Sequence, residues 1–164
     1  MRTLILICLI AFLGSTNLKA QTAEYVGSNK CKMCHNKPAD ANTPSVYAHW
    51  KDSKHAKAME VLSAAEAADP KCTKCHATAA SVNKDLVTPG LKITEGVSCE
   101  SCHGPGSLYF PNTIMKDKAK AIEKGMTVPS EKICKTCHNA ESKHYKGFDY
   151  KEMVKKITHP KPAA

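Results

Sequence analysis

The sequence predicts a mainly α-helical protein with extensive irregular structure, built as one compact domain over residues 21–164. Two observations favour this fold class. Helix formers with capping residues recur along the chain, and no stretch alternates apolar with polar residues as a half-buried strand does. In addition, only 5% of the residues are aromatic, which is few for an ordinary core. We therefore expect a bound group to fill the centre of the domain.

Residues 1–20 are expected to be a secretory signal peptide that is not part of the fold. Arg2 precedes ten apolar residues, Leu4–Leu13, and a short polar stretch leads to a cleavage site after Ala20. The apolar run is too short to span a bilayer as a helix. We therefore expect an exported protein, periplasmic or extracellular, with no stable membrane insertion after signal cleavage.

All eight cysteines beyond residue 20 fall into four C-x-x-C-H units. The units comprise Cys31, Cys34 and His35; Cys72, Cys75 and His76; Cys99, Cys102 and His103; and Cys134, Cys137 and His138. Four copies of so specific a pattern do not arise by chance, and C-x-x-C-H is the attachment signature of c-type haem. The sequence therefore predicts four covalently attached haem c groups, each with the histidine of its unit as the proximal iron ligand.

The spacing within each unit suits haem better than the other uses of paired cysteines. Two thiols add across the two vinyl groups of one porphyrin, and the two intervening residues set that reach. An even number of cysteines in an exported chain also suggests disulfides, but the repeated C-x-x-C-H spacing argues against them. A thioredoxin-like redox pair needs one C-x-x-C and no histidine, and structural zinc leaves an awkward ligand count.

The proposed cofactor also accounts for the composition. Removing residues 1–20 leaves 144 residues for four haem groups, so we expect a compact multihaem cytochrome c fold in which the haems form the core. The chain has 24 Lys and Arg against 15 Asp and Glu, a formal net charge of +9, which haem propionates would offset. No nucleic acid partner is therefore expected, although lysines away from the propionates can steer an acidic redox partner.

The first half of the domain is expected to contain one long helix. Residues 21–30 form a short extended lead-in. Thr43 and Pro44 have the pattern of an N-cap followed by proline at the first helical position. Strong helix formers then continue over residues 45–68 until a proline stops the helix. Residues 77–98 are expected to be a loop, because they contain Thr-Pro-Gly and a further glycine.

Shorter helices are expected in the second half. Residues 112–124 have a helical pattern that ends at Gly125. Ser130 can cap a helix carrying the fourth unit, and Asp149 can cap a last helix that ends before Pro160. The first cysteines of successive units are 41, 27 and 35 residues apart, so the binding unit repeats while the fold around it does not.

Four histidines outside the units are the candidate distal ligands, namely His49, His55, His144 and His159. Their number would allow a second imidazole at every iron, although each could instead be a surface side chain. On one continuous helix His49 and His55 would project about 120° apart, so they could serve two different haems but not the same one. Met115 is the alternative ligand, since thioether ligation occurs in c-type cytochromes and raises the potential.

Longer stretches around the units add a resemblance. They are Tyr25–His35, Trp50–Ala56, Gly96–Gly106, Cys137–Asn139 and Ile157–Pro160. Together they resemble the cytochrome c-554-like family of tetrahaem electron carriers. The resemblance implies a mostly helical fold with stacked haem pairs, an exported electron-transfer role, and distal ligation by His55 and His159. Many relatives have a histidine shortly after Gly-Pro-Gly where this chain has Tyr109, so one five-coordinate iron is a further hypothesis.

The leading functional hypothesis is an electron relay, and not an enzyme. Closely packed haems would pass single electrons between redox protein donors and acceptors that are periplasmic or membrane-bound. Ligand identity, burial and nearby charge would set the four potentials. Two alternatives stay open: a reductase of a small nitrogen or sulfur species at one five-coordinate haem, and a subunit of a conductive cytochrome filament.

Overall fold

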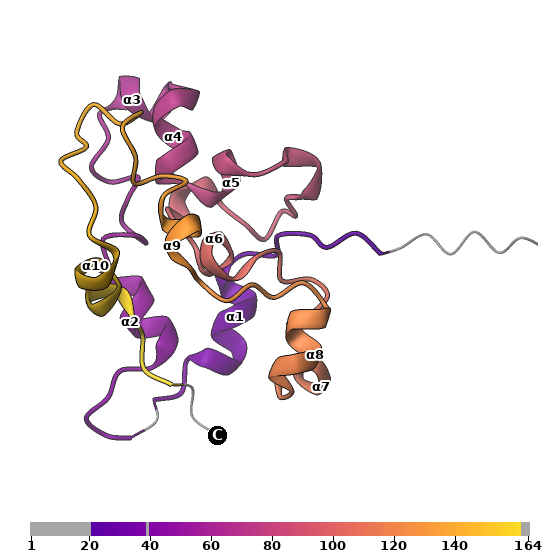
Figure 1. Cartoon of the computed structure of the whole chain (residues 1–164). Helices are drawn as coiled ribbons and strands as arrows, with labels where there is room; N and C mark the ends of the chain where they lie inside the picture. The colour runs from indigo at the N-terminus through magenta and orange to yellow at the C-terminus, as the bar shows by residue number, and fades with distance from the viewer. Residues whose placement is uncertain (1–20, 39, 162–164) are drawn as a thin grey trace, which may run out of the picture.

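A computed structural model describes residues 21–38 and 40–161, and the expected signal peptide lies outside them (Figure 1). Four helices carry the C-x-x-C-H units: α1 (Ser28–His35), α4 (Pro70–His76), α6 (Cys99–His103) and α9 (Glu131–Cys134). The other elements are α2 (Val46–Asp52), α3 (Ala64–Ala68), α5 (Thr78–Ser81), α7 (Asn112–Met115), α8 (Lys118–Glu123), α10 (Tyr150–Ile157) and the 3₁₀ turns η1 (Lys84–Leu86) and η2 (Ile93–Glu95).

The predicted fold class is confirmed. In the described residues the one β-type pairing is an isolated parallel bridge between Tyr25 and Val87, where the lead-in meets the loop before the third unit. Short helices joined by irregular segments make up the rest (Figure 1). No helix in this part of the chain is long and apolar enough to cross a membrane.

The prediction of a single helix over residues 45–68 is wrong, because polar capping residues divide the segment into two helices. α2 begins after Ser45, whose hydroxyl accepts the N–H of Ala48 at 3.0 Å, and it ends before Ser53. α3 begins only after Ser63, which forms a capping box with Glu66. Serine hydroxyls that bond the backbone compete with helix propagation. The histidine at position 55 therefore lies in turns after α2 and shares no helix with His49, so their 120° separation does not apply.

Other helix boundaries also differ from the sequence prediction. Ser45 and not Thr43 caps α2. Pro70 starts the helix that carries the second unit, since proline is well tolerated at the first helical position. The helix expected over 112–124 is broken, because the Asp117 carboxylate caps α8. The last helix is confirmed: Asp149 accepts the N–H of Glu152 at 3.2 Å.

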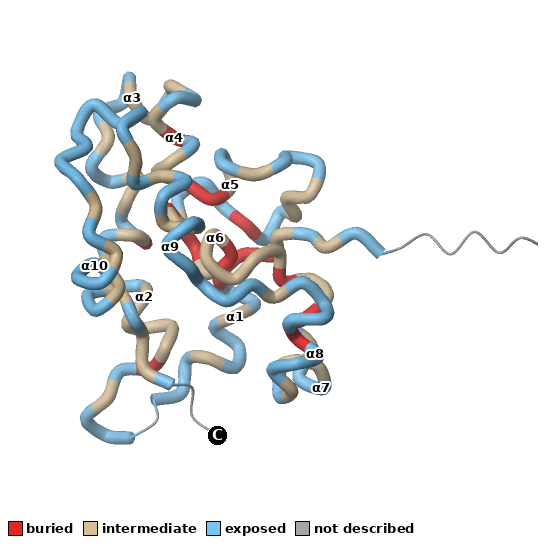
Figure 2. Tube along the Cα trace, in the orientation of Figure 1, coloured by how far each residue is buried: buried red, intermediate tan, exposed pale blue. Residues whose placement is uncertain are grey.

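Few residues are buried, and many of them are small or polar. In the described part of the chain they are Val26, Ala56, Ala77, Leu91, Tyr109, Ala121, Ser28, Ser45, Thr73, Thr78, Ser98 and Glu100. Figure 2 shows much of this set gathered near α5 and α6, while α2 is mostly of intermediate burial and α10 is mostly exposed. A polypeptide with so little apolar interior matches a multihaem fold, in which the cofactors complete the core.

Gly96 fixes the segment that contains His55. Its φ is +64°, and a Cβ there would lie 2.5 Å from the carbonyl oxygen of His55 and 2.7 Å from that of Ala56. The next residue, Val97, donates its N–H to the His55 carbonyl at 2.9 Å and accepts the indole N–H of Trp50 at 2.9 Å. Only glycine permits this close approach of the two chain segments.

Replacing Gly96 with alanine should therefore lower the free energy of unfolding by clearly more than a left-handed alanine alone costs, about 1–2 kcal/mol. The matched control is Gly147→Ala, where φ is +93° but the space around a Cβ is open, so that variant should lose only this conformational cost. Thermal unfolding of the two purified holo-proteins measures the difference. Equal losses would contradict a packing role for Gly96.

Candidate functional site

Each C-x-x-C-H unit lies on or beside one helical turn. α1, α4 and α6 end at the histidine of their unit, and after α9 the N–H of His138 still bonds the carbonyl of Cys134 at 3.0 Å. Residues three and four apart project from the same face of a helix. Both sulfur atoms and the imidazole of a unit therefore leave the backbone on one side, and none of the eight cysteines in the described residues forms a disulfide. This arrangement fits attachment of one porphyrin per turn.

Backbone carbonyl groups orient three of the imidazoles. The Nδ1 atoms bond Ala58 O at 2.7 Å in His76, Thr127 O at 3.3 Å in His103, and Pro160 O at 2.9 Å in His159. A carbonyl oxygen can only accept, so each Nδ1 carries the proton and donates it. Nε2 then keeps its lone pair, which is the tautomer and support typical of metal-bound histidine.

Two candidate distal histidines each face a unit histidine. The ring centroids of His55 and His138 are 6.1 Å apart, and those of His103 and His159 are 6.0 Å apart. Two imidazoles that bind one metal ion from opposite sides have centroids about 6 Å apart, because each metal–nitrogen bond is about 2 Å. The two pairs therefore fit the axial ligands of an iron at the third and fourth units.

Burial favours the form of the imidazole that binds metal. It lowers the pKa of His35, His55 and His103, with neighbouring imidazoles adding to the effect. These rings are therefore neutral at pH 7, and only neutral imidazole ligates a metal ion. The buried Nδ1 atom of His35 also has no hydrogen-bond partner among the described residues.

The first and second units differ from the other two. Among the described residues no imidazole faces His35 or His76 at the distance seen in the two pairs. His49 is half-buried on α2, and His144 is exposed in the loop after α9. Ligation of iron by His49, His144 or Met115 stays a prediction.

Neighbouring side chains give the order of the units in space. Glu100 of the third unit accepts the N–H groups of Val26 and Gly27 just before α1, so the third unit lies beside the first. Cys134 and Cys137 lie near Cys102, so the fourth unit lies beside the third. Cys137 also lies near Cys75, and Lys74 pairs with Glu141, so the fourth unit lies beside the second. The order is first, third, fourth, second.

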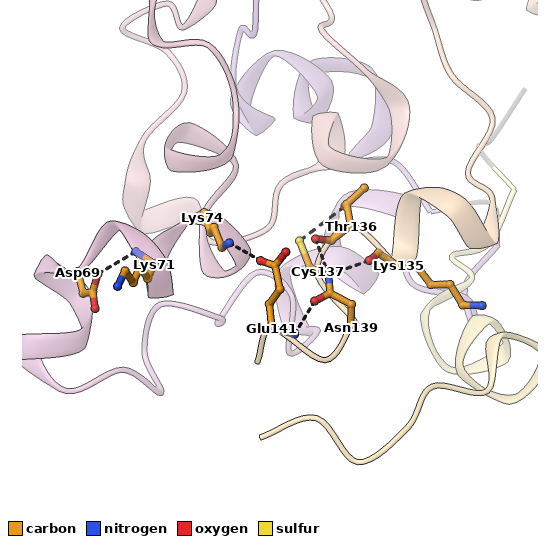
Figure 3. A network of polar contacts seen from close by, with 8 residues as sticks. All are labelled: Asp69, Lys71, Lys74, Lys135, Thr136, Cys137, Asn139 and Glu141. Carbon is orange, nitrogen blue, oxygen red and sulfur yellow. Dashed lines mark hydrogen bonds and ion pairs between the residues drawn. The ribbon is translucent and has the colours of Figure 1, made fainter. Parts of the chain in front are cut away.

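Two ion pairs accompany the contact between the second and fourth units. Lys74 Nζ lies 2.5 Å from Glu141, and Lys143 Nζ lies 2.8 Å from Glu66. Figure 3 shows Lys74 directed at Glu141, whose own loop is held by Asn139 next to Cys137. Solvent screens such exposed pairs, so they orient the loop more than they stabilise it.

Sequence reasoning missed two residues that support the imidazoles. Thr127 orients His103 through its carbonyl, and its hydroxyl donates to the carbonyl of Cys102 at 2.7 Å. Phe148 stacks on His138 with ring centroids 4.7 Å apart and planes 17° from parallel. Neither lies in a C-x-x-C-H unit, and no local pattern marks residues that reach a unit only after the chain turns back.

The comparisons with known proteins agree with this geometry. A family model described as cytochrome c554 and c-prime matches residues 30–104, which span the first three units. Cytochrome c-554 from Nitrosomonas europaea is 29% identical over 184 residues, which cover 84% of this chain and 75% of that protein. Both matches support a cytochrome c-554-like family for this chain. They indicate a c-type cytochrome with covalently bound haem iron and a role in electron transfer. No solved structure matches the chain.

The imidazole pairs generate a test of axial ligation. We expect His55→Ala and His159→Ala each to convert one low-spin iron into a high-spin iron that binds carbon monoxide, because each removes one ring of a facing pair. His144→Ala is the matched control and should change neither property, since that side chain is exposed. Electron paramagnetic resonance and carbon monoxide difference spectra report the outcome. An unchanged low-spin signal in His55→Ala would contradict the pairing.

Proposed function

We propose that this cytochrome carries four covalently attached haem c groups and relays single electrons between redox partners outside the cytoplasm. The observation that supports the proposal is the order in which the units lie beside one another, from the first through the third and fourth to the second. Each cysteine pair attaches one haem, with the histidine of its unit as proximal ligand. Export follows from the expected signal peptide, because c-type haem is attached outside the cytoplasm.

The residues of the chain set how such a relay works. Haem iron supplies a one-electron couple whose potential depends on its ligands, burial and nearby charge. His159 would hold the iron at the third unit together with His103, and His55 the iron at the fourth unit together with His138, which are the two interior positions of the order. Two imidazoles would then close each interior site. The first and second units form the two ends, where electrons enter and leave through partner proteins.

Removing an interior unit should break the relay, and removing a terminal unit should only shorten it. We expect four haems per chain in the wild type by pyridine haemochrome assay, and three in both Cys134→Ala/Cys137→Ala and Cys72→Ala/Cys75→Ala. After a pulse of reductant, electrons should still equilibrate among the three haems of Cys72→Ala/Cys75→Ala, the terminal variant, at a rate independent of protein concentration. In Cys134→Ala/Cys137→Ala, the interior variant, the haem at the second unit is cut off from the others. It should be reduced only at a rate that depends on protein concentration.

Two results would overturn the proposal. A count below four haems in the wild type would mean that one unit carries no haem. The fourth unit would be the first candidate, because it lies outside residues 30–104 matched by the family model. If electrons equilibrated among all three haems of the interior variant at a rate independent of protein concentration, they would not be following the order first, third, fourth, second. Haem counts of three in both variants are the control that each protein has folded around its remaining cofactors.

One observation favours a second candidate function, reduction of a small nitrogen or sulfur species at an open iron. Tyr109 is 4% exposed and donates its hydroxyl to the carbonyl of Gly104 at 2.8 Å, so its oxygen is engaged by the backbone. It therefore does not replace a distal histidine in the segment after Gly-Pro-Gly. A high-spin signal in the oxidised wild type that shifts with nitric oxide would support the reductase, and four inert low-spin irons would exclude it.

A further inference from the structure

Glu100 is a carboxylate buried inside the third C-x-x-C-H unit. It lies between Cys99 and Cys102 on α6 and is 2% exposed. Within residues 21–38 and 40–161 no ion pair involves it. A charged side chain is rarely buried without a partner of opposite charge. Its surroundings must therefore explain how the carboxylate is held.

Three backbone N–H groups hold this carboxylate. Oε1 accepts from Val26 at 2.9 Å and from Gly106 at 2.7 Å, while Oε2 accepts from Gly27 at 2.8 Å. Burial raises the pKa of Glu100, and these three bonds act in the opposite direction. A carboxylate with two or three backbone donors is strongly favoured in its ionised form. Three neutral dipoles stabilise the charge here, and they do not cancel it.

The titratable groups that interact with Glu100 are Tyr25 on the lead-in, Glu95 on η2, Cys99 on α6 and Tyr109 after Gly-Pro-Gly, and none of these four is a cation. Burial raises the pKa of both tyrosines, so they stay neutral at pH 7. Cys99 belongs to the third unit, and the donors Val26 and Gly27 directly precede α1, which carries the first unit. The carboxylate thus lies where two attachment sites meet.

We propose that Glu100 is an ionised buried carboxylate that lowers the reduction potentials of the haem irons at the first and third units. Oxidised iron carries one more positive charge than reduced iron, so a nearby anion in a low-dielectric interior stabilises the oxidised state. Among the described residues Glu100 is the one buried carboxylate, and it belongs to the third unit and lies beside the first, not the second or fourth. The inference rests on the proposed relay and makes the first and third units its more reducing half.

Glu100→Gln tests the inference because it removes the charge and can keep two of the three hydrogen bonds, with its amide oxygen at the position of Oε1. We expect two of the four midpoint potentials to rise. The expected change is at least tenfold in each reduction equilibrium, about 59 mV for a one-electron couple. Spectroelectrochemical titration at pH 7 measures all four steps. Glu95→Gln is the matched control: its carboxylate also accepts a lead-in N–H, from Ser28 at 2.9 Å, but it is only half-buried, and its potentials should move little.

Further variants separate charge from structure. Glu100→Asp keeps the charge and should keep both potentials low. Glu100→Ser replaces the glutamine variant if that variant does not fold. It removes the charge, leaves room for water at the three N–H groups, and should raise the same two potentials. Equal rises in the aspartate and glutamine variants would mean a structural cause and overturn the inference. So would unchanged potentials in a charge-removing variant with four haems, whereas a wild type that fails the haem count or the relay test would overturn the proposed function instead.

Discussion

One helical turn must point two sulfur atoms and one imidazole in the same direction, and the rest of the structure is arranged around that requirement. α1, α4 and α6 are five to eight residues long and end at their unit histidine, so little of each helix extends beyond the attachment turn. Caps such as Asp69 before α4 start these turns. Short helices of this kind are marginal alone, so their stability depends on what is bound to their inner face.

The sequence could predict the units and the fold class from spacing and local motifs, and the family resemblance pointed to the two histidines that face unit histidines. It could not predict which units lie side by side. The first unit lies beside the third through the N–H groups of Val26 and Gly27 on Glu100, and Lys74 meets Glu141 after a long separation in sequence. The prediction of one helix over residues 45–68 was wrong because that segment, too, depends on single side-chain hydrogen bonds. Propensity favours helix there, but two serine caps redirect the chain.

The turns that follow α2 determine where His55 lies relative to the fourth unit. Because α2 stops at Asp52, the next residues form turns that bring the carbonyl of His55 against Gly96 and its ring opposite His138. A continuous helix would instead carry His55 away along the helix axis. The interruption of the helix is thus what allows the ring of His55 to face His138, a residue far from it in sequence. Irregular structure here has a positional role.

Charge in this protein divides into two populations with different effects. Most of the 24 Lys and Arg are exposed, and exposed pairs such as Lys74–Glu141 are screened within about 8–10 Å at ordinary salt. They govern solubility and encounter with partners. Glu100 belongs to the second population, since at 2% exposure water cannot screen it. The Coulomb energy at a fixed distance rises as the effective dielectric falls, about fourfold from bulk water to a value near 20. One buried carboxylate can therefore set the potential of a neighbouring iron more strongly than several surface lysines.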